Sequence, residues 1–591
     1  MPTVAAHAGT RPARRWPWVV AGAAVLALVP VGLFAWDGYQ LLTSVDELES
    51  SAAAAQQAVT DRDATALTTE VADLQVAAAT FAAHSSGWHW DLAAHVPWVS
   101  DQTVPLQQVG QSVSVIADDA LGPLADMGDL SALEAPPIQD GRIDPFFLED
   151  FRAPLAQASD VLAEQSEQLA AVDMTGTLEQ ISDPYEGLED DLSQMGDLVY
   201  VAHVAAELLP TMLGGEEPRT YALMVQNNAE PRASGGIPGA VLELTVDDGR
   251  VSLGDYIPAS TMSDPQNPVA TLTDDEERIY SIKMAQYAQN VNFTPEYPRA
   301  AEVMAAFWER ETGEAVDGVL SIDPVAMGYM LDGMEPVTID DVEITSDNLA
   351  QVLLSDVYWK YPEPQQSDAF FALAARELFG QLLGGTTDVM GGVETAIDQR
   401  RFLAWSAHGS EQDLLATVPL AGDLVSDGDT TGVYLNDANG AKIGYYIDQD
   451  IEVTNTVCAG GEVRGQTLAV TFTHTYDGDI EELPDYVSGG GQFVDVGQFV
   501  ANMHFYPPEG STVTRVEQDG NAALYSPDTH DGRAMLTLRI DLSPGEGTTV
   551  EFQTSLAEPA PQAPQVAWTP LSRVANVTDV KTLGGSSTNT C

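Results

Sequence analysis

The sequence predicts a multidomain α+β protein. Its expected parts are an N-terminal transmembrane helix, a helical stalk or bundle, an α/β head with a central mixed sheet, and a C-terminal β-sandwich. Three observations predict this order. A long uncharged stretch stands near the start of the 591-residue chain, and apolar residues at helical spacing follow it. The pattern then changes to mixed strands and helices, and finally to short alternating strands.

The uncharged stretch runs from Trp16 to Trp36, which is long enough to cross a bilayer core of about 30 Å. Three arginines precede it and acidic residues follow it, so residues 1–15 are expected to be a cytoplasmic tail and the rest of the chain extracellular. No small-x-small cleavage pattern precedes Trp36, which favours an uncleaved anchor over a signal peptide. We therefore expect a single-pass protein of the cell membrane, held in the cytoplasmic membrane by residues 16–36.

The charge balance restricts the partners. The chain has 24 basic and 89 acidic residues, a formal net charge of -65. Binding nucleic acid requires lysine and arginine to neutralise phosphates, so a nucleic-acid partner is excluded. Apolar residues make up 44% of the chain, which excludes an acidic disordered protein.

Residues 37–213 are predicted to form the extracellular helical stalk, because apolar side chains recur at spacings of three and four. His84, His89 and His95 cluster there beside two tryptophans. They lack the ligand spacing typical of a metal site, and no acidic or cysteine partner accompanies them in the sequence. We interpret them as packing residues at a helix corner.

Residues 214–425 are predicted to form the α/β head, in which strand patterns alternate with helical ones. The Asp248-Gly249 pair predicts a hairpin turn. Residues 432–556 read as a β-sandwich of short strands, and 557–591 as a C-terminal tail closed by Cys591. The two cysteines, Cys458 and Cys591, fit either a disulfide, which an extracellular compartment permits, or two unrelated thiols.

The most unusual polar motif is QNNAEPRASGG at residues 226–236, directly after the buried strand RTYALMV. A pyrophosphate site needs a cationic fork, N–H donors and a carboxylate for magnesium. Arg232 offers the fork, Glu230 the carboxylate, and the neighbouring asparagines and glycines offer donors and close backbone approach. The ligand-binding candidates are Asn227, Asn228, Glu230, Arg232, Gly235, Gly236, Asp368 and Arg376, with Arg299 and Lys283 as further candidates.

Glu230 and Asp368 are the candidates for holding Mg²⁺, the one cofactor that this chemistry implies. A structural alternative exists for the motif. Glu230 and Arg232 stand two apart on one strand and can pair with other charges, and the glycines can shape a tight connection. No other sequence pattern typical of a catalytic site accompanies the motif.

The motif and its surroundings, RTYALMVQNNAEPRASGGIPGAVLELTVDDGRV, resemble the bacterial domain of unknown function 4012 family, which is common in actinobacterial envelopes. A second block, from Asn290 to Asp341, agrees with this resemblance. Residues 219–385 resemble more distantly the LytR-CpsA-Psr family, membrane-anchored enzymes that move polyprenyl-pyrophosphate-linked glycopolymers onto the cell wall. That resemblance implies a pyrophosphate and metal site near the first strands and an Asp/Arg helix near Gln366 to Leu383. The chain departs from it in having only Arg376 after Asp368.

Two functions are therefore expected. In the first, the head of a cell-envelope protein binds a lipid-linked or anionic glycan ligand, as a functional or degenerate glycopolymer phosphotransferase with Arg232 as clamp. In the alternative, the protein is a non-catalytic structural, scaffold or adhesion element of the envelope or cell wall. An apolar tunnel beside Arg232 would favour the first, because a polyprenyl chain needs room. A salt-bridged Arg232 in a closed core would count against the enzyme.

Overall fold

The computed structural model describes residues 33–34, 36–41, 44, 47–48, 50–55 and 57–58, and then 64–125, 138–139, 141–384, 389–424, 428–458, 462–560 and 562–583. The described residues fall into two compact units. The first lies within Met1–Glu134 and Phe147–Glu207, and the second within Ala135–Phe146 and Leu208–Cys591.

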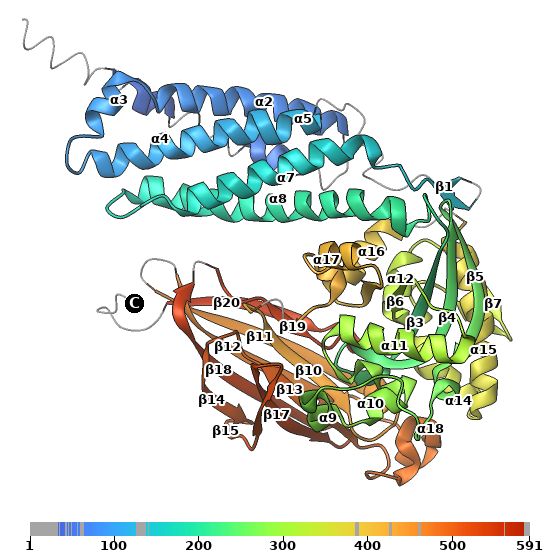
Figure 1. The fold of residues 1–591 in the computed structure, drawn as a ribbon. Helices are drawn as coiled ribbons and strands as arrows, with labels where there is room; N and C mark the ends of the chain where they lie inside the picture. The colour runs from blue at the N-terminus through green and yellow to red at the C-terminus, as the bar shows by residue number, and fades with distance from the viewer. Residues whose placement is uncertain are drawn as a thin grey trace, which may run out of the picture. The chain divides into compact units, whose positions relative to one another are not determined.

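The first unit is a helical bundle (Figure 1). Val71 and Leu74 pack there in one core with Ala158 and Leu162, so residues three and four apart share a buried face. Its helices are α2 (Ala64–His84), α3 (Trp88–Ala93), α4 (Ser100–Val115), the π-helical segment Ile116–Leu121, α5 (Gly122–Ala125), α7 (Glu149–Ala170) and most of α8 (Glu179–Met212).

The clustered histidines of this unit bind a carboxylate. Asp37 is contacted by His84 Nδ1 at 2.8 Å and by His89 Nε2 at 2.5 Å. His95 contacts the backbone carbonyl of Asp91 instead. The histidines thus link the first described helical residues to the end of α2 and to α3, which is a packing role.

The predicted transmembrane helix needs correction. No helix in the described part of the chain is both long and apolar enough to cross a membrane. Residues 16–32 of the expected span 16–36 lie outside the described residues. The described helical residues directly after this span include the polar Asp37 and Gln40, and Leu41 packs against Phe81 inside the bundle. The described fold is therefore α+β with several sheets, and none of its described helices could span a membrane.

The second unit begins with a seven-stranded mixed sheet in the order β1-β2-β5-β4-β3-β6-β9. β3 and β6 are parallel, and the other neighbours are antiparallel. The strands are β1 (Ile138–Gln139), β2 (Arg142–Ile143), β3 (Arg219–Arg232), β4 (Gly235–Asp247), β5 (Arg250–Pro258), β6 (Gly318–Ile322) and β9 (Phe402–Ser406).

Strand β3 is longer than the sequence suggests, since it continues beyond Val225 through the polar motif to Arg232. Its pairing with β4 is irregular between Asn227 and Pro231, as at a β-bulge, and resumes where Pro231 faces Gly236. The predicted turn between β4 and β5 is confirmed. Asp248 and Gly249 have φ angles of 47° and 71°, the left-handed conformation that a tight hairpin turn requires.

Helices cover both faces of this sheet (Figure 1). Met224 and Val241 point to one face and pack with Phe307 of α11, whereas Leu223 and Val225 point to the other and pack with Ile322 and its neighbours. The helices are α9 (Asp274–Tyr280), α10 (Lys283–Gln286), α11 (Tyr297–Thr312), α12 (Pro324–Met330), α13 (Leu349–Gln351), α14 (Val357–Lys360), α15 (Pro364–Leu382), α16 (Val389–Asp398) and α17 (Gly409–Leu415). A two-stranded sheet, β7 (Val337–Ile339) and β8 (Val342–Ile344), precedes α13.

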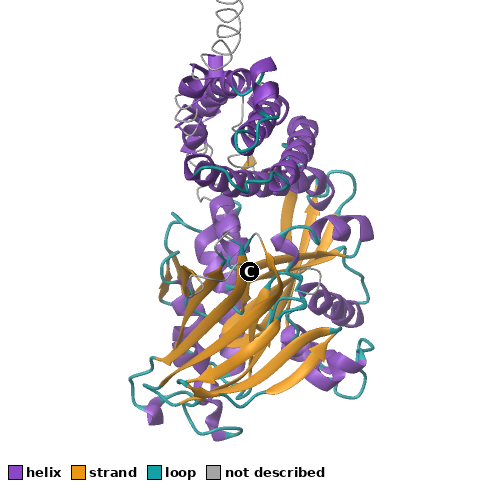
Figure 2. Ribbon diagram, turned by 90° about the vertical axis from the view of Figure 1, so that its left-hand side faces the viewer, coloured by secondary structure: helices purple, strands orange, loops and turns teal. Residues whose placement is uncertain are grey.

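The C-terminal part is a β-sandwich of two sheets, in the orders β16-β17-β13-β10-β19 and β15-β14-β18-β12-β11-β20 (Figure 2). The rings of Phe505 and Phe552 stack at 3.9 Å between centroids in its core. Its strands are β10 (Thr431–Asp437), β11 (Ile447–Val457), β12 (Val463–His474), β13 (Phe499–Tyr506), β14 (Thr512–Gln518), β15 (Asn521–Ala522), β16 (Ser526–His530), β17 (Arg533–Leu542), β18 (Gly547–Ala560), β19 (Val566–Trp568) and β20 (Asn576–Leu583).

Two details of the sandwich differ from expectation. β19 and β20 come from the segment expected to be a tail, and they add parallel edge strands to the two sheets. The expected Cys458–Cys591 disulfide is not part of the described structure, because no disulfide joins two described residues and Cys591 lies outside them. Cys458 itself is buried just after β11.

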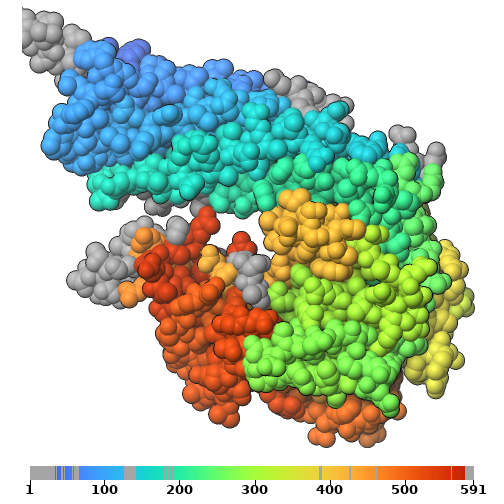
Figure 3. Space-filling model, viewed as in Figure 1, coloured from blue at the N-terminus to red at the C-terminus, as the bar shows by residue number. Residues whose placement is uncertain are grey.

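Head and sandwich belong to the same unit, and their surfaces meet directly in the space-filling view, the head in green to yellow and the sandwich in orange to red (Figure 3).

Candidate functional site

The charges of the polar motif are paired inside the protein. Glu230 Oε1 accepts a hydrogen bond from Arg232 Nη2 at 2.7 Å, and its Oε2 accepts one from Lys442 Nζ at 2.6 Å. All three side chains are at most 8% exposed. Burial by itself raises the pKa of Glu230, but the adjacent charges of Lys442 and Arg232 hold it below its ordinary value. Both carboxylate oxygens are therefore occupied by cations.

Asp437, at the end of β10, completes this group. Its Oδ2 accepts N–H groups of Asn439 and Gly440 at 3.1 and 2.5 Å and lies 3.9 Å from Arg232 Nη1. Its Oδ1 has no hydrogen-bond partner among the described residues. Burial, and then the charge of Glu230, raise the pKa of Asp437 to about 7. Glu230, Arg232, Asp437 and Lys442 are called the charge cluster below.

The uncharged residues of the motif join the head to the sandwich or stabilise the β3–β4 connection. Asn228 Nδ2 donates to the carbonyl of Pro570 at 2.8 Å, and Asn227 Nδ2 to the hydroxyl of Tyr358 at 2.5 Å. Gln226 Oε1 accepts the N–H of Gly236 at 3.0 Å. A Cβ at Gly235 would stand 1.7 Å from that same amide oxygen, and its φ is 134°, so only glycine fits there.

The remaining predicted residues are dispersed. Asp368 is half-buried near the start of α15, and burial raises its pKa. Arg376 and Lys283 are exposed. Arg299 is paired with Glu276, at 2.6 Å.

The predicted magnesium site lacks the arrangement that a hard cation needs, since Glu230 already contacts two cations. In the part of the chain that the structure describes, no group of three or more histidine, cysteine or carboxylate side chains is placed to hold a metal ion.

A cavity of about 190 Å³ lies between the sheet and α15, on the face opposite α11. Its floor is formed by apolar residues of β3, β4 and β5, and its far wall by α15, which lies beside β5 and β7 (Figure 1). The apolar lining consists of Leu223, Val225, Ile237, Pro238, Gly239, Ala240, Leu242, Leu253, Ile322, Pro324, Met327, Leu353, Pro364, Phe371, Ala374, Ala375, Leu378, Phe379 and Leu382.

The sequence of α15 explains the space. Phe371, Ala375, Leu378 and Leu382 recur at spacings of three and four, so they share the helix face toward the sheet. Ala374 and Ala375 are small, and Gly239 on β4 has no side chain. Between larger neighbours such as Phe371 and Leu378, these positions leave volume unfilled.

One end of the cavity is polar. Lys442 and Tyr486 lie there, both from the sandwich part of the chain, together with Asn227 and Tyr358 of the head. The ring of Tyr486 lies 5.3 Å from that of Tyr358 and 5.7 Å from Lys442 Nζ. Asp368 and Lys442 are the charged residues of the lining. Lys442 thus belongs both to the charge cluster and to the cavity.

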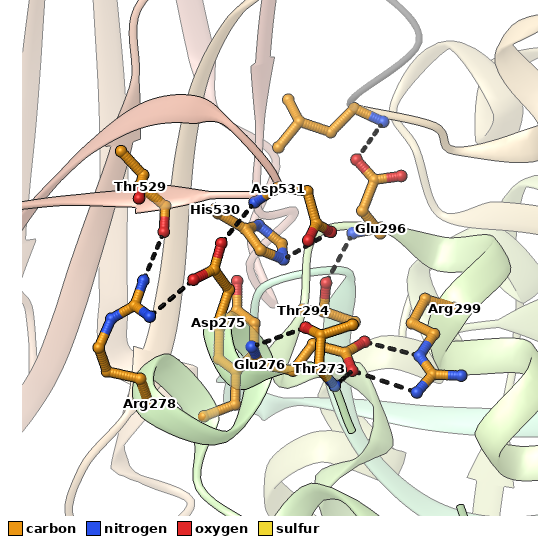
Figure 4. A network of polar contacts seen from close by, with 12 residues as sticks. Thr273, Asp275, Glu276, Arg278, Thr294, Glu296, Arg299, Thr529, His530 and Asp531 are labelled. Atoms are coloured by element: carbon orange, nitrogen blue, oxygen red, sulfur yellow. Dashed lines mark hydrogen bonds and ion pairs between the residues drawn. The ribbon is translucent and has the colours of Figure 1, made fainter. Parts of the chain in front are cut away.

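Head and sandwich also meet at a second polar junction, seen in Figure 4. Arg278 of α9 binds Asp275 of its own helix at 2.6 Å and reaches Asp528 and the carbonyl of Thr529 on β16, both at 2.8 Å. The Arg278 side chain is 44% exposed. We call these residues the surface junction.

Aromatic and histidine side chains fill the space behind the surface junction. Tyr506 OH lies 3.1 Å from both Tyr280 OH and His530 Nδ1. Burial, and then the charge of His530, lower the pKa of the nearby His504 to about 4. These histidines are therefore neutral near pH 7, and they act as packing and hydrogen-bonding groups.

The sequence did not point to Lys442 or Tyr486. Lys442 stands alone in GAKIGYY, and 212 residues separate it from Glu230. The one available signal is the scarcity of cations, since a lysine among mostly apolar neighbours in so acidic a chain is unusual. The helical spacing of α15 was visible, but spacing cannot show whether a face packs tightly or leaves a gap.

A family model described as a protein of unknown function (DUF4012) matches residues 216–358, which supports the resemblance to that family. The matched segment begins just before β3 and ends at Tyr358 in α14. It includes the polar motif and the sheet floor of the cavity, whereas α15, Lys442 and Tyr486 lie beyond it. A comparison with curated proteins finds no match.

Proposed function

We propose that the head binds the hydrocarbon chain of an amphipathic, lipid-like ligand in the cavity between β3–β5 and α15. The observation that carries this proposal is the cavity itself. It is lined mainly by apolar side chains, and Asn227, Tyr358, Tyr486 and Lys442 lie close together in its lining as a polar end. This is the usual composition of a small-molecule site, in which apolar walls supply affinity and a few polar groups fix orientation.

The cavity is large enough to hold part of a hydrocarbon chain. An apolar cavity of about 150 Å³ is large enough to bind benzene, and this one measures about 190 Å³. Each methylene group removed from water contributes about 0.8 kcal/mol. A few methylene groups in the cavity thus provide appreciable affinity, while the rest of a longer chain extends beyond it.

The distant LytR-CpsA-Psr resemblance agrees with a lipid-linked ligand but not with its pyrophosphate clamp. Arg232 is 6% exposed at its side chain and already paired with Glu230. It is absent from the cavity lining, so it cannot fork onto a pyrophosphate there. We therefore propose binding rather than phosphotransfer. The location in the cell envelope that the sequence suggests stays a prediction. Amphiphiles of this class occur in cell envelopes.

A structural role fits the charge cluster better than a ligand role does. The cluster joins β3 of the head to β10 and Lys442 of the sandwich. This supports the structural alternative for the Glu230–Arg232 motif, and it leaves the cavity available for binding.

Displacement of cis-parinaric acid, a fatty acid whose fluorescence rises in apolar surroundings, tests the proposal. We expect binding to the unaltered protein and a loss of at least about tenfold in affinity in Ala375→Trp, which fills the cavity. Ala369→Trp is the matched control, because Ala369 is exposed on the same helix and outside the lining. Equal affinity in all three proteins would place the ligand elsewhere and contradict the proposal.

A further inference from the structure

We propose that the ligand of this cavity is an amphiphile whose polar end carries a single negative charge, held by Lys442 under the ring of Tyr486. This inference rests on the proposed function and names the ligand class of the same site. It follows from the donors that Lys442 leaves unused and from the charge balance of the cluster behind it.

Lys442 is placed to serve a ligand. Its side chain is 7% exposed, so its ammonium is shielded from bulk water. Within the described chain, its hydrogen bond to Glu230 is the one recorded for that group, and an ammonium has three N–H donors. The remaining donors are available at the polar end of the cavity, where Lys442 belongs to the lining.

The charge balance selects an anion. Arg232 and Lys442 contribute two positive charges, and Glu230 contributes one negative charge between them. Asp437 is the fourth member, and one of its oxygens has no partner. Because burial raises the pKa of Asp437 to about 7, the cluster carries one net positive charge below that pH. A buried net charge is unfavourable, and a monoanion beside Lys442 neutralises it.

The lining disfavours a more highly charged head group. Lys442 is its one cation, and Asp368 is a carboxylate at the same cavity. A pyrophosphate would bring two or more charges against one available ammonium. A phosphodiester or a carboxylate brings one, which the cluster can balance.

Tyr486 closes the polar end. It lies in α18 (Asp485–Ser488), a short helix within the long connection between β12 and β13. The connection turns sharply after it, because Gly489 and Gly490 have φ angles of 75° and 57°. Through Tyr486 and Lys442 the sandwich part of the chain supplies the polar end of a cavity whose apolar part belongs to the head.

The experiment compares two ligands with the same acyl chain, 1-myristoylglycerol and 1-myristoyl-glycerol-phosphoglycerol. The second has an added phosphoglycerol group, which carries one permanent negative charge. At about pH 6 we expect the anionic ligand to bind about tenfold more tightly. This preference should decrease toward about pH 8, because ionised Asp437 repels the anion. The charged groups facing Asp437 are Glu230 and Arg232 of β3 and Lys442 beyond β10.

The double variant Glu230→Gln/Lys442→Met removes an ion pair as a unit and leaves Arg232 with Asp437 as its partner. We expect it to bind both ligands equally, while the control Ala369→Trp, which lies outside the lining, keeps the preference. Equal affinities in the unaltered protein, or a preference that persists in the double variant, would overturn this inference and leave the proposed function intact. Failure of both ligands to bind would overturn this inference and the proposed function together. Should the double variant not fold, the ligand pair and the pH series on the unaltered protein still decide.

Discussion

Head and sandwich are joined by two polar junctions of opposite character. In the charge cluster, the side chains of Glu230 and Arg232 are 8% and 6% exposed, and almost every charged atom has a fixed partner. In the surface junction, Arg278 is 44% exposed and Asp528 32% exposed. Both contain close ion pairs, at 2.7 and 2.8 Å. Burial, not distance, therefore determines what each contributes.

The difference shows where a ligand can bind. In the buried junction Glu230 neutralises the charge of Arg232, and water cannot replace a missing partner. Only Lys442 extends from it to a cavity. The conspicuous polar motif is thus framework, and binding capacity lies in the apolar space beside it.

The largest expected effect is that of Glu230→Ala. It leaves Arg232 and Lys442 buried without their carboxylate, and breaking a buried pair in this way costs about 3–5 kcal/mol. Urea unfolding near pH 7, followed by circular dichroism, measures the loss. Glu452→Ala, at an exposed position of β11, is the control. A loss below about 1 kcal/mol would show that the cluster is hydrated and that its charges are not tightly coupled.

Asp437→Asn is expected to change the pH dependence of stability. The pKa of Asp437 is raised on folding from 3.8 to about 7, so its favourable contribution is fully present below the unfolded value and is lost as the pH rises through about 7. Asparagine does not ionise, so the variant does not lose stability in this way as the pH rises. The unfolding free energy of the variant, relative to the unaltered protein, should rise by about 2–3 kcal/mol between pH 5 and pH 7.

Urea unfolding at both pH values measures this difference. The histidines with lowered pKa, such as His504, act in the opposite direction in both proteins and cancel in the comparison. A constant difference between the two proteins would mean that Asp437 is ionised in the fold throughout this range. The net positive charge inferred for the cluster would then be absent.

The smallest expected effect is that of Arg278→Ala in the surface junction. Exposed ion pairs contribute about 0.2–1 kcal/mol, and salt screens them. We expect a loss of this size in dilute buffer and a smaller one in molar salt. A loss comparable with that of Glu230→Ala would remove the distinction between the two junctions.

The sequence was sufficient to predict most helices, strands and turns, but not which residues interact across them. The helical spacing predicted the bundle, and the Asp248-Gly249 turn and the alternating strands were predicted correctly, because these patterns are local. The sequence could not show that β3 continues to Arg232, since amides and charges in a strand need partners from elsewhere. Those partners, such as Lys442 and Pro570, lie more than two hundred residues away.

The candidate site shows the same limit. Asp368 was among the residues selected from the sequence, and it does line the cavity. The sequence suggested it as a ligand-binding and metal-binding residue, whereas the structure places it in the lining of a mainly apolar cavity. The cavity itself depends on small residues in its lining, Ala374 and Ala375 of α15 and Gly239 of β4. No sequence pattern distinguishes such a gap from ordinary packing.

The most direct test of the central claim is a crystal structure of the protein with 12-bromododecanoic acid, using the anomalous scattering of bromine. We expect a bromine peak between β4 and α15, near Leu378, and the carboxylate toward Lys442. A peak at Arg232, a peak on the outer surface or no peak at saturating ligand would contradict the assignment of the cavity as the binding site.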